Sequence, residues 1–192
     1  SAYFTLIPIY GKELLDATAF NVSFLTLALA VGVGIGSLIC EKISRGTIDL
    51  GLVSIAIVLI SLVSVEIFVL GEIISNGGEC NLYSSVLIKC FNRFFLDMIV
   101  LGAAGALYVI PLYAALQNRI NRTHRARTMA ALNIMNALFM VVSSVFTLIL
   151  FRLEIETHHI FALVGVLHIT ITVVASIYIP EILWRKQKPF HK

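Results

Sequence analysis

Charge is scarce in this sequence. Aspartate, glutamate, lysine and arginine make up 13% of the 192 residues, and the mean hydropathy is +0.96. Soluble domains carry about a quarter charged residues. The composition therefore argues against a soluble globular protein and predicts an integral membrane protein.

Cysteines and catalytic motifs are also scarce. Cys40, Cys80 and Cys90 match neither a metal-ligand spacing nor an even-numbered disulfide framework. Cys80 and Cys90 share one long connection and pair only if that compartment is oxidising. The sequence has no P-loop, no G-x-G-x-x-G and no G-x-S-x-G motif. It therefore predicts no enzymatic activity and no cofactor.

Long apolar runs dominate what remains. A membrane-spanning helix needs about 20 predominantly apolar residues. Five runs reach this length. A sixth run, residues 1–10, is too short to span alone and is interpreted as the outer end of a helix. Because no linker separates these runs, we expect residues 1–192 to form a single helical bundle. The five full spans are expected at residues 22–40, 50–70, 96–116, 129–150 and 160–179.

Basic residues follow the first, third and last full spans, whereas the other connections mix basic with acidic residues. The positive-inside rule then places the basic connections and the C-terminus in the cytoplasm. Residues 118–127 sit between two spans, which favours contact with anionic lipid headgroups over nucleic acid. The basic residues are Lys42, Arg45, Arg119, Arg122, Arg125, Arg127, Arg185, Lys186, Lys188 and Lys192.

Polar side chains inside spans are costly and are therefore functional candidates. Asn133 and Asn136 share a helix face because they are three residues apart. They are interpreted either as ligands for a substrate headgroup or as amides that join packed helices. His168, in the middle of the last span, is either a proton carrier or a neutral packing residue.

Small residues recur every four positions in the first full span. Ala28, Gly32, Gly36 and Cys40 lie on one face, which predicts close helix packing in lipid. Gly34 lies on the opposite side, so the helix is expected to admit close neighbours from two directions.

The span at residues 96–116 contains Gly102, Gly105 and Pro111, which are expected to be helix-packing positions. Proline removes a backbone hydrogen bond and bends a helix, so this span is expected to be the most deformable one. Tyr113 and Gln117 lie beyond the proline and either line a cavity or sit at the membrane interface.

Three ionisable residues lie near the outer ends of spans. Arg93 and Asp97 are four residues apart and are expected to form a local ion pair on one helix face. Glu66 is expected about one turn from the outer end of its span. No acidic residue is then placed near the centre of a span.

His158 and His159 are expected in an outer connection beside Glu154 and Glu156. Adjacent residues of a helix point to different sides. The sequence therefore predicts no metal site here.

One stretch resembles a known loop motif. Residues 37–46, SLICEKISRG, are similar to the degenerate second copy of the loop that major facilitator transporters carry between neighbouring helices. Glu41 stands for the acid of that motif, and Lys42 and Arg45 stand for its bases. Ser37 and Ser44 replace its two glycines. The resemblance implies that Glu41, Lys42 and Arg45 form a gating loop.

Within that superfamily the chain resembles the lysophospholipid transporters, including forms fused to an acyltransferase and an acyl-carrier-protein synthetase. The similar runs are VGIGSLICEKIS (33–44), GALYVIPLYAALQ (105–117) and RARTMAALNIMNALFMVVSS (125–144). Leu132 stands where that family often has a second asparagine.

The resemblance implies an all-α membrane protein, with five full spans plus the end of a first. These would form the six-helix C-terminal bundle of a major facilitator fold in the bacterial inner membrane. It implies inward movement of lysophospholipid for reacylation, without ATP, together with an N-terminal half and a fused or associated acyltransferase. The alternatives are a facilitator for another amphipathic solute and a non-transporting membrane anchor of a lipid-acylating enzyme.

Overall fold

The computed structural model describes residues 2–13, 18–44, 48–76, 85–120, 122–178 and 186–187. Within these residues the protein is helical, apart from two paired strands of two residues each. The elements are α1 (Ala2–Glu13), α2 (Ala19–Ser44), β1 (Ile48–Asp49), α3 (Gly51–Ser75), α4 (Ser85–Arg119), η1 (Arg122–His124), α5 (Arg125–Arg152), α6 (Thr157–Tyr178) and β2 (Lys186–Gln187).

The helices α2 to α6 each contain a segment long and apolar enough to cross a membrane. This confirms the prediction of an all-helical membrane protein with five spans. The helices extend beyond the apolar runs that predicted them: α3, for example, ends at Ser75 rather than at residue 70. The residues that extend α3 include Glu72 and Ser75, and polar residues of this kind end an apolar run without ending the helix.

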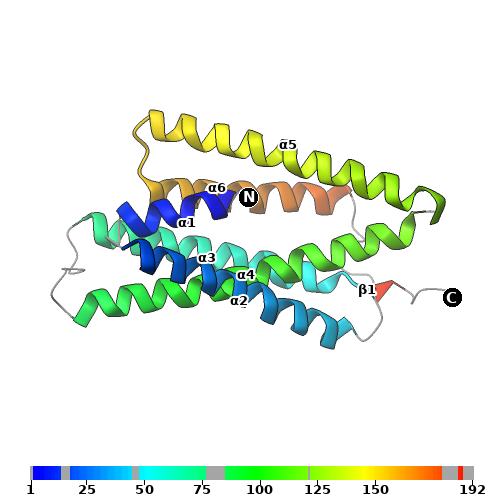
Figure 1. Ribbon diagram of the computed structural model, residues 1–192, viewed down its shortest axis with the longest axis horizontal. Coiled ribbons are helices and arrows are strands. Elements are labelled where there is room, and N and C mark those ends of the chain that lie inside the picture. Colours follow the sequence, from blue (N-terminus) through cyan, green and yellow to red (C-terminus); the bar gives the residue numbers. More distant parts are fainter. Residues whose placement is uncertain are drawn as a thin grey trace.

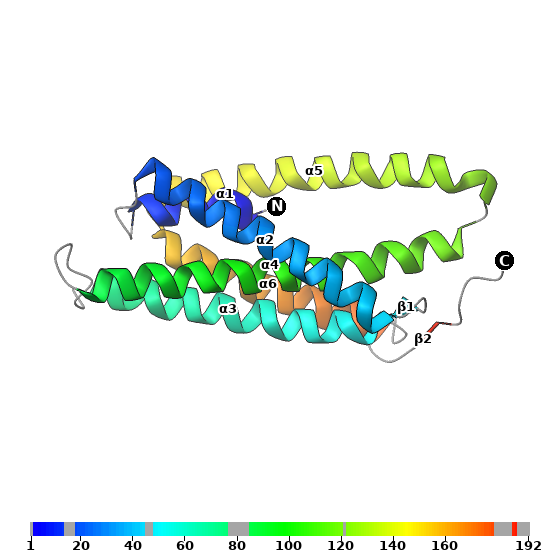
Figure 2. The ribbon, with the colours of Figure 1, turned by 60° about the horizontal axis from the view of Figure 1, so that its bottom comes forward.

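The helices lie side by side along the long axis, and most of their connections gather at two ends (Figure 1). We call the end where α2 and α4 end and α5 begins the basic end, because Lys42 and Arg125–Arg127 lie there. We call the opposite end, where α3 and α5 end and α6 begins, the histidine end. Figure 2 shows the same two ends after rotation.

The contact between α2 and α4 is the closest in the bundle. An added Cβ at Gly32 would overlap the backbone of Ile99, and one at Gly36 would overlap the backbone of Ala103. From the other side, a Cβ at Gly102 would overlap the backbone carbonyl of Leu29. Small residues thus let the two backbones touch, and contact of this kind drives helix association in lipid.

Two glycines do not take part in this contact. An added Cβ at Gly105 or at Gly34 would meet no atom within 4 Å. Among the described residues, Gly105 therefore makes no close helix contact, and α2 is closely approached on one side rather than on the two expected. Within the described part of the chain, α4 is the helix that meets the small-residue face of α2. Pro111 is buried and α4 runs through it as one helix.

Aromatic rings fill the core toward the histidine end. Tyr10 of α1 stacks on Phe94 of α4, with 4.7 Å between ring centroids, and meets the ring of Phe161 of α6 edge-on. Its hydroxyl donates a hydrogen bond to the backbone carbonyl of Ile67 in α3 at 3.1 Å. The short α1 is thus fixed against three other helices by one side chain.

Helix α5 contacts the rest of the bundle sparingly (Figure 1). Of its 28 residues only Thr147 and Leu150, near the histidine end, are buried. Residues 133–142 are exposed on every face of the helix.

The tail returns to the basic end. Strands β1 and β2 pair antiparallel, with Ile48 opposite Gln187 and Asp49 opposite Lys186. This pairing fixes residues 186–187 beside the connection between α2 and α3.

Candidate functional site

Polar side chains from α4 and α5 meet toward the basic end. The amide of Asn136 donates a hydrogen bond to the hydroxyl of Tyr113. One turn further along α4, the amide of Gln117 lies 3.9 Å from the sulfur of Met129. The structure thus brings together three of the residues predicted to line a substrate cavity, at the α4–α5 contact. An amide and a phenol there offer both donors and acceptors to a polar ligand.

The other two predicted cavity residues lie elsewhere. Asn133 is exposed on α5, and no hydrogen bond joins its side chain to another of the described residues. His168 in α6 faces Tyr108 of α4, with 5.3 Å between ring centroids, and its buried Nε2 has no hydrogen-bond partner among the described residues. The five candidates therefore do not form one site.

The predicted gating loop is largely helical. Glu41 and Lys42 belong to the last turn of α2 and are exposed. A lysine at this position is favourable because it interacts with the unpaired carbonyls at the C-terminus of a helix. The helix therefore continues where the motif predicted a loop. Arg45 lies outside the described residues.

The predicted ion pair between Arg93 and Asp97 is wrong. The guanidinium Nε of Arg93 lies 2.5 Å from a carboxylate oxygen of Glu66, which joins α4 to α3. Asp97 is buried near Glu66, and its Oδ2 has no hydrogen-bond partner among the described residues. Helix contact across the bundle brings Glu66 closer to Arg93 than the spacing within one helix suggested.

The depth of Glu66 also differs from the expectation. Because α3 ends at Ser75, Glu66 lies more than two helical turns from that end. Glu66 of α3 and Asp97 of α4 therefore both lie within helices that are long and apolar enough to cross a membrane.

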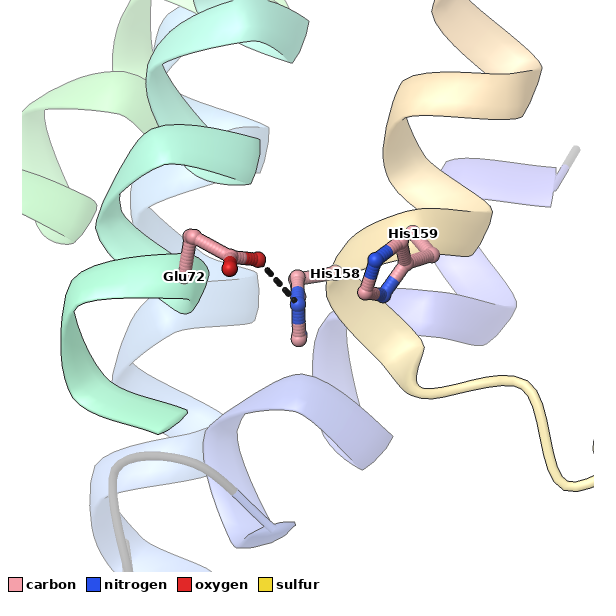
Figure 3. A group of neighbouring side chains, drawn as sticks. All are labelled: Glu72, His158 and His159. Atoms are coloured by element: carbon pink, nitrogen blue, oxygen red, sulfur yellow. Dashed lines mark hydrogen bonds and ion pairs between the residues drawn. The ribbon is translucent and has the colours of Figure 1, made fainter. Parts of the chain in front are cut away.

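The two adjacent histidines begin α6 and do not diverge. Their ring centroids are 4.2 Å apart, and His158 is buried whereas His159 is exposed. Glu72 of α3 faces them, with its Oε2 3.2 Å from Nε2 of His158 (Figure 3). The expectation that the two rings point apart is wrong because imidazoles in the first turn of a helix are long enough to swing together.

Sequence reasoning missed Glu72 because it comes from a distant helix, 86 residues before His158. Only the packing of α3 on α6 joins them. Among the cysteines, Cys40 is buried as a free thiol. Cys80 and the side chain of Cys90 lie outside the described residues.

Comparison with protein-family models, with curated proteins and with solved structures gave no match.

Proposed function

We propose that this chain forms one half of a facilitator-type transporter that moves lysophospholipid to the cytoplasmic face of a bacterial inner membrane for reacylation. In this proposal the basic end and the C-terminus face the cytoplasm, and an N-terminal half completes the transporter. The observation that supports the proposal most is the exposure of α5, which joins the bundle at its ends and leaves its middle uncovered.

The spacing along α5 supports a wall of a shared cavity. Arg125, Met129 and Asn136 lie on one face, because four and eleven residues correspond to nearly whole turns. Met129 and Asn136 on this face reach α4, and the buried Thr147 and Leu150 continue it. Between Asn136 and Thr147 no described residue is buried. A second bundle seated against this stretch would enclose it.

The chemistry of this face suits an amphipathic lipid. Tyr113 and Asn136 supply a polar contact, and the exposed side chains of residues 137–142 are all apolar. The Nε of Arg125 is buried without a hydrogen-bond partner among the described residues. A guanidinium binds a phosphate through paired charge-assisted hydrogen bonds. The polar contacts would hold the headgroup and the apolar stretch would accommodate the acyl chain.

The proposal is tested with the protein as its gene encodes it, reconstituted in vesicles. Labelled lysophosphatidylethanolamine is added, and the fraction that albumin no longer extracts gives the rate of inward movement. Asn136→Ala should lower this rate about twofold to tenfold, as expected for the loss of one hydrogen bond of about 0.5–1.5 kcal/mol.

Asn92→Ala is the matched control and should leave the rate unchanged. Asn92 is also an exposed amide, but it lies on α4, away from the Tyr113–Asn136 contact. Residues 1–192 alone should move no lysolipid, since one half lacks the opposite wall. A wild-type rate for Asn136→Ala, or for residues 1–192 alone, would contradict the proposal.

The Glu66–Asp97 pair favours a second candidate function, proton-coupled transport of a cationic amphipathic solute. Asp97 is buried and its Oδ2 has no hydrogen-bond partner among the described residues, and an acidic side chain inside a membrane-spanning helix is suited to proton or cation binding. The same vesicles discriminate the two functions. If a pH gradient drives uptake of a cationic dye and Asp97→Asn abolishes that uptake, the second function holds.

A further inference from the structure

Three side chains with metal-ligand atoms converge at the histidine end of the bundle (Figure 3). Each of Glu72, His158 and His159 offers one ligand atom, and these atoms all lie within 4.8 Å of one another. Glu72 comes from the last turns of α3, whereas both histidines come from the first turn of α6. The group is separate from the Tyr113–Asn136 contact, which lies toward the basic end.

The spacing of two of these atoms matches metal ligands. Zinc binds imidazole nitrogen and carboxylate oxygen at about 2.0–2.2 Å, so neighbouring ligands of a tetrahedral site lie about 3.3 Å apart. The Nε2 of His158 and the Oε2 of Glu72 are separated by 3.2 Å. His159 is exposed, so its ring can rotate to bring a nitrogen to a third position.

A second layer of polar groups orients these ligands. The Nδ1 of His158 is buried and makes no hydrogen bond of good geometry, and its neighbour is the Oε2 of Glu156 at 3.4 Å. The hydroxyl of Ser75 donates to that same oxygen at 3.1 Å. A proton on Nδ1 facing Glu156 would leave the lone pair of Nε2 directed at Glu72. Ligating histidines in metal sites commonly have such a carboxylate partner.

The carboxylate of Glu72 is held as well. Its Oε1 accepts a hydrogen bond of 2.8 Å from the amide of Asn76, which leaves Oε2 for His158. The turn that precedes α6 positions Glu156 and the two histidines. The N–H of Ile155 donates to the carbonyl of Leu150, and Glu154 adopts a left-handed conformation with φ 58°. This is a Schellman motif, which fixes the path of the chain into Glu156 and the histidines.

The packing makes room for a buried imidazole. An added Cβ at Gly71 would overlap the Cβ of His158, so α3 has no side chain at the position where the histidine enters. The ring of Phe68 lies 5.9 Å from that of His158 and 5.6 Å from that of His159. A polar ring in such a place costs free energy unless its nitrogens are satisfied. Ligation of Nε2 and a carboxylate at Nδ1 would satisfy both.

We propose that Glu72, His158 and His159 bind a divalent transition-metal ion of the zinc type, with Glu156 as the positioning residue for His158. Two imidazoles and one carboxylate favour Zn²⁺, Ni²⁺ or Cu²⁺ over Mg²⁺ or Ca²⁺, which prefer oxygen ligands alone. Three protein ligands leave a fourth position for water. The ion would join α3 to α6 at the histidine end, whatever the transported solute is.

The test uses the tag-free chain in detergent, stripped with a chelator and dialysed against Zn²⁺ with excess Mg²⁺. Metal analysis should find one Zn²⁺ per chain. Co²⁺ in place of Zn²⁺ should give the visible absorption of a tetrahedral site, which an ion bound to scattered surface carboxylates would not give.

The ligands are tested with substitutions at exposed or half-exposed positions. His159→Ala and Glu72→Gln should each remove the Co²⁺ absorption and lower the Zn²⁺ affinity by at least about 100-fold. Glu156→Gln should lower the affinity by about 10–100-fold, as for other outer partners of ligating histidines. The controls are His124→Ala and Glu41→Gln, both exposed at the basic end, and they should bind as the wild type does.

Thermal unfolding in chelator shows whether each variant is folded, so a loss of binding can be separated from a loss of structure. A wild-type chain that binds no Zn²⁺ would overturn the proposal, and the cluster would then be an ion pair of His158 with two carboxylates. Binding that survives both His159→Ala and Glu72→Gln would overturn it too.

Discussion

The helix pair α2–α4 and the helix α5 use apolar residues in opposite ways. Gly32, Gly36 and Gly102 bring the backbones of α2 and α4 into contact. Helix α5 instead carries large apolar side chains, of which Ile134 is 70% exposed and Phe139 is 61% exposed. All three helices are apolar enough to span a membrane, yet only α2 and α4 pack closely against each other.

The difference shows that apolar character alone does not attach a helix to its neighbours in a membrane. Lipid tails are as apolar as leucine, so burying an apolar side chain against protein gains little there. Close packing of small residues provides the attachment instead. Helix α5, which contains no glycine, is held at its ends and leaves its faces to lipid or to another bundle.

The largest effect that would test this contrast comes from two phenylalanines. Phe94 on α4 is fully buried and stacks on Tyr10, so Phe94→Ala would lose these ring contacts and leave a cavity, and it should lower the free energy of unfolding by about 3–5 kcal/mol. Phe139→Ala on α5 should change it by no more than about 0.5 kcal/mol. Unfolding in mixed micelles measures both. Equal losses would mean that α5 is packed against a partner, such as a second copy.

A smaller effect is expected within α2. Gly36→Leu places a side chain against the backbone of α4, and overpacking of this kind costs about 1–3 kcal/mol. Gly34→Leu is the matched control, because Gly34 has nothing near it. The same micelle titration should show no loss for the control. If both substitutions destabilise equally, the glycine contact does not hold the pair.

The smallest effect would refine the contrast within a single helix. Gly105→Ala should raise the stability by about 0.4–1 kcal/mol, because alanine loses less backbone entropy and meets no neighbour. Gly102→Ala should lower it, since the added Cβ would overlap the carbonyl of Leu29. Thermal unfolding in detergent compares the two variants. A gain at both positions would argue against the close α2–α4 contact.

Much of the fold was predictable because it depends on local patterns. Apolar runs of sufficient length predicted the five spans, and the four-residue spacing of small residues predicted the packed face of α2. The same reasoning placed Gly105 wrongly, because spacing does not say which face of a helix meets a neighbour. It also ended α3 too early, which placed Glu66 nearer the end of the helix than it lies.

The candidate sites were predictable only in part. Asn136 and Tyr113 were identified as polar residues inside spans, but not as partners of each other. Arg93 was paired with Asp97 on its own helix, whereas it meets Glu66 of α3. The sequence does not place Glu72 beside the histidines, because Glu72 and His158 are 86 residues apart in the chain.

The sequence by itself determined that this chain is a helical membrane protein, because the length and polarity of each run decide whether it crosses a bilayer. It also determined which face of α2 is small enough for close contact. The tertiary structure alone decided which helix fills that contact, which carboxylate meets Arg93, and that Glu72 faces two histidines. These pairings join residues far apart in the chain, and they depend on how backbones cross rather than on any local pattern.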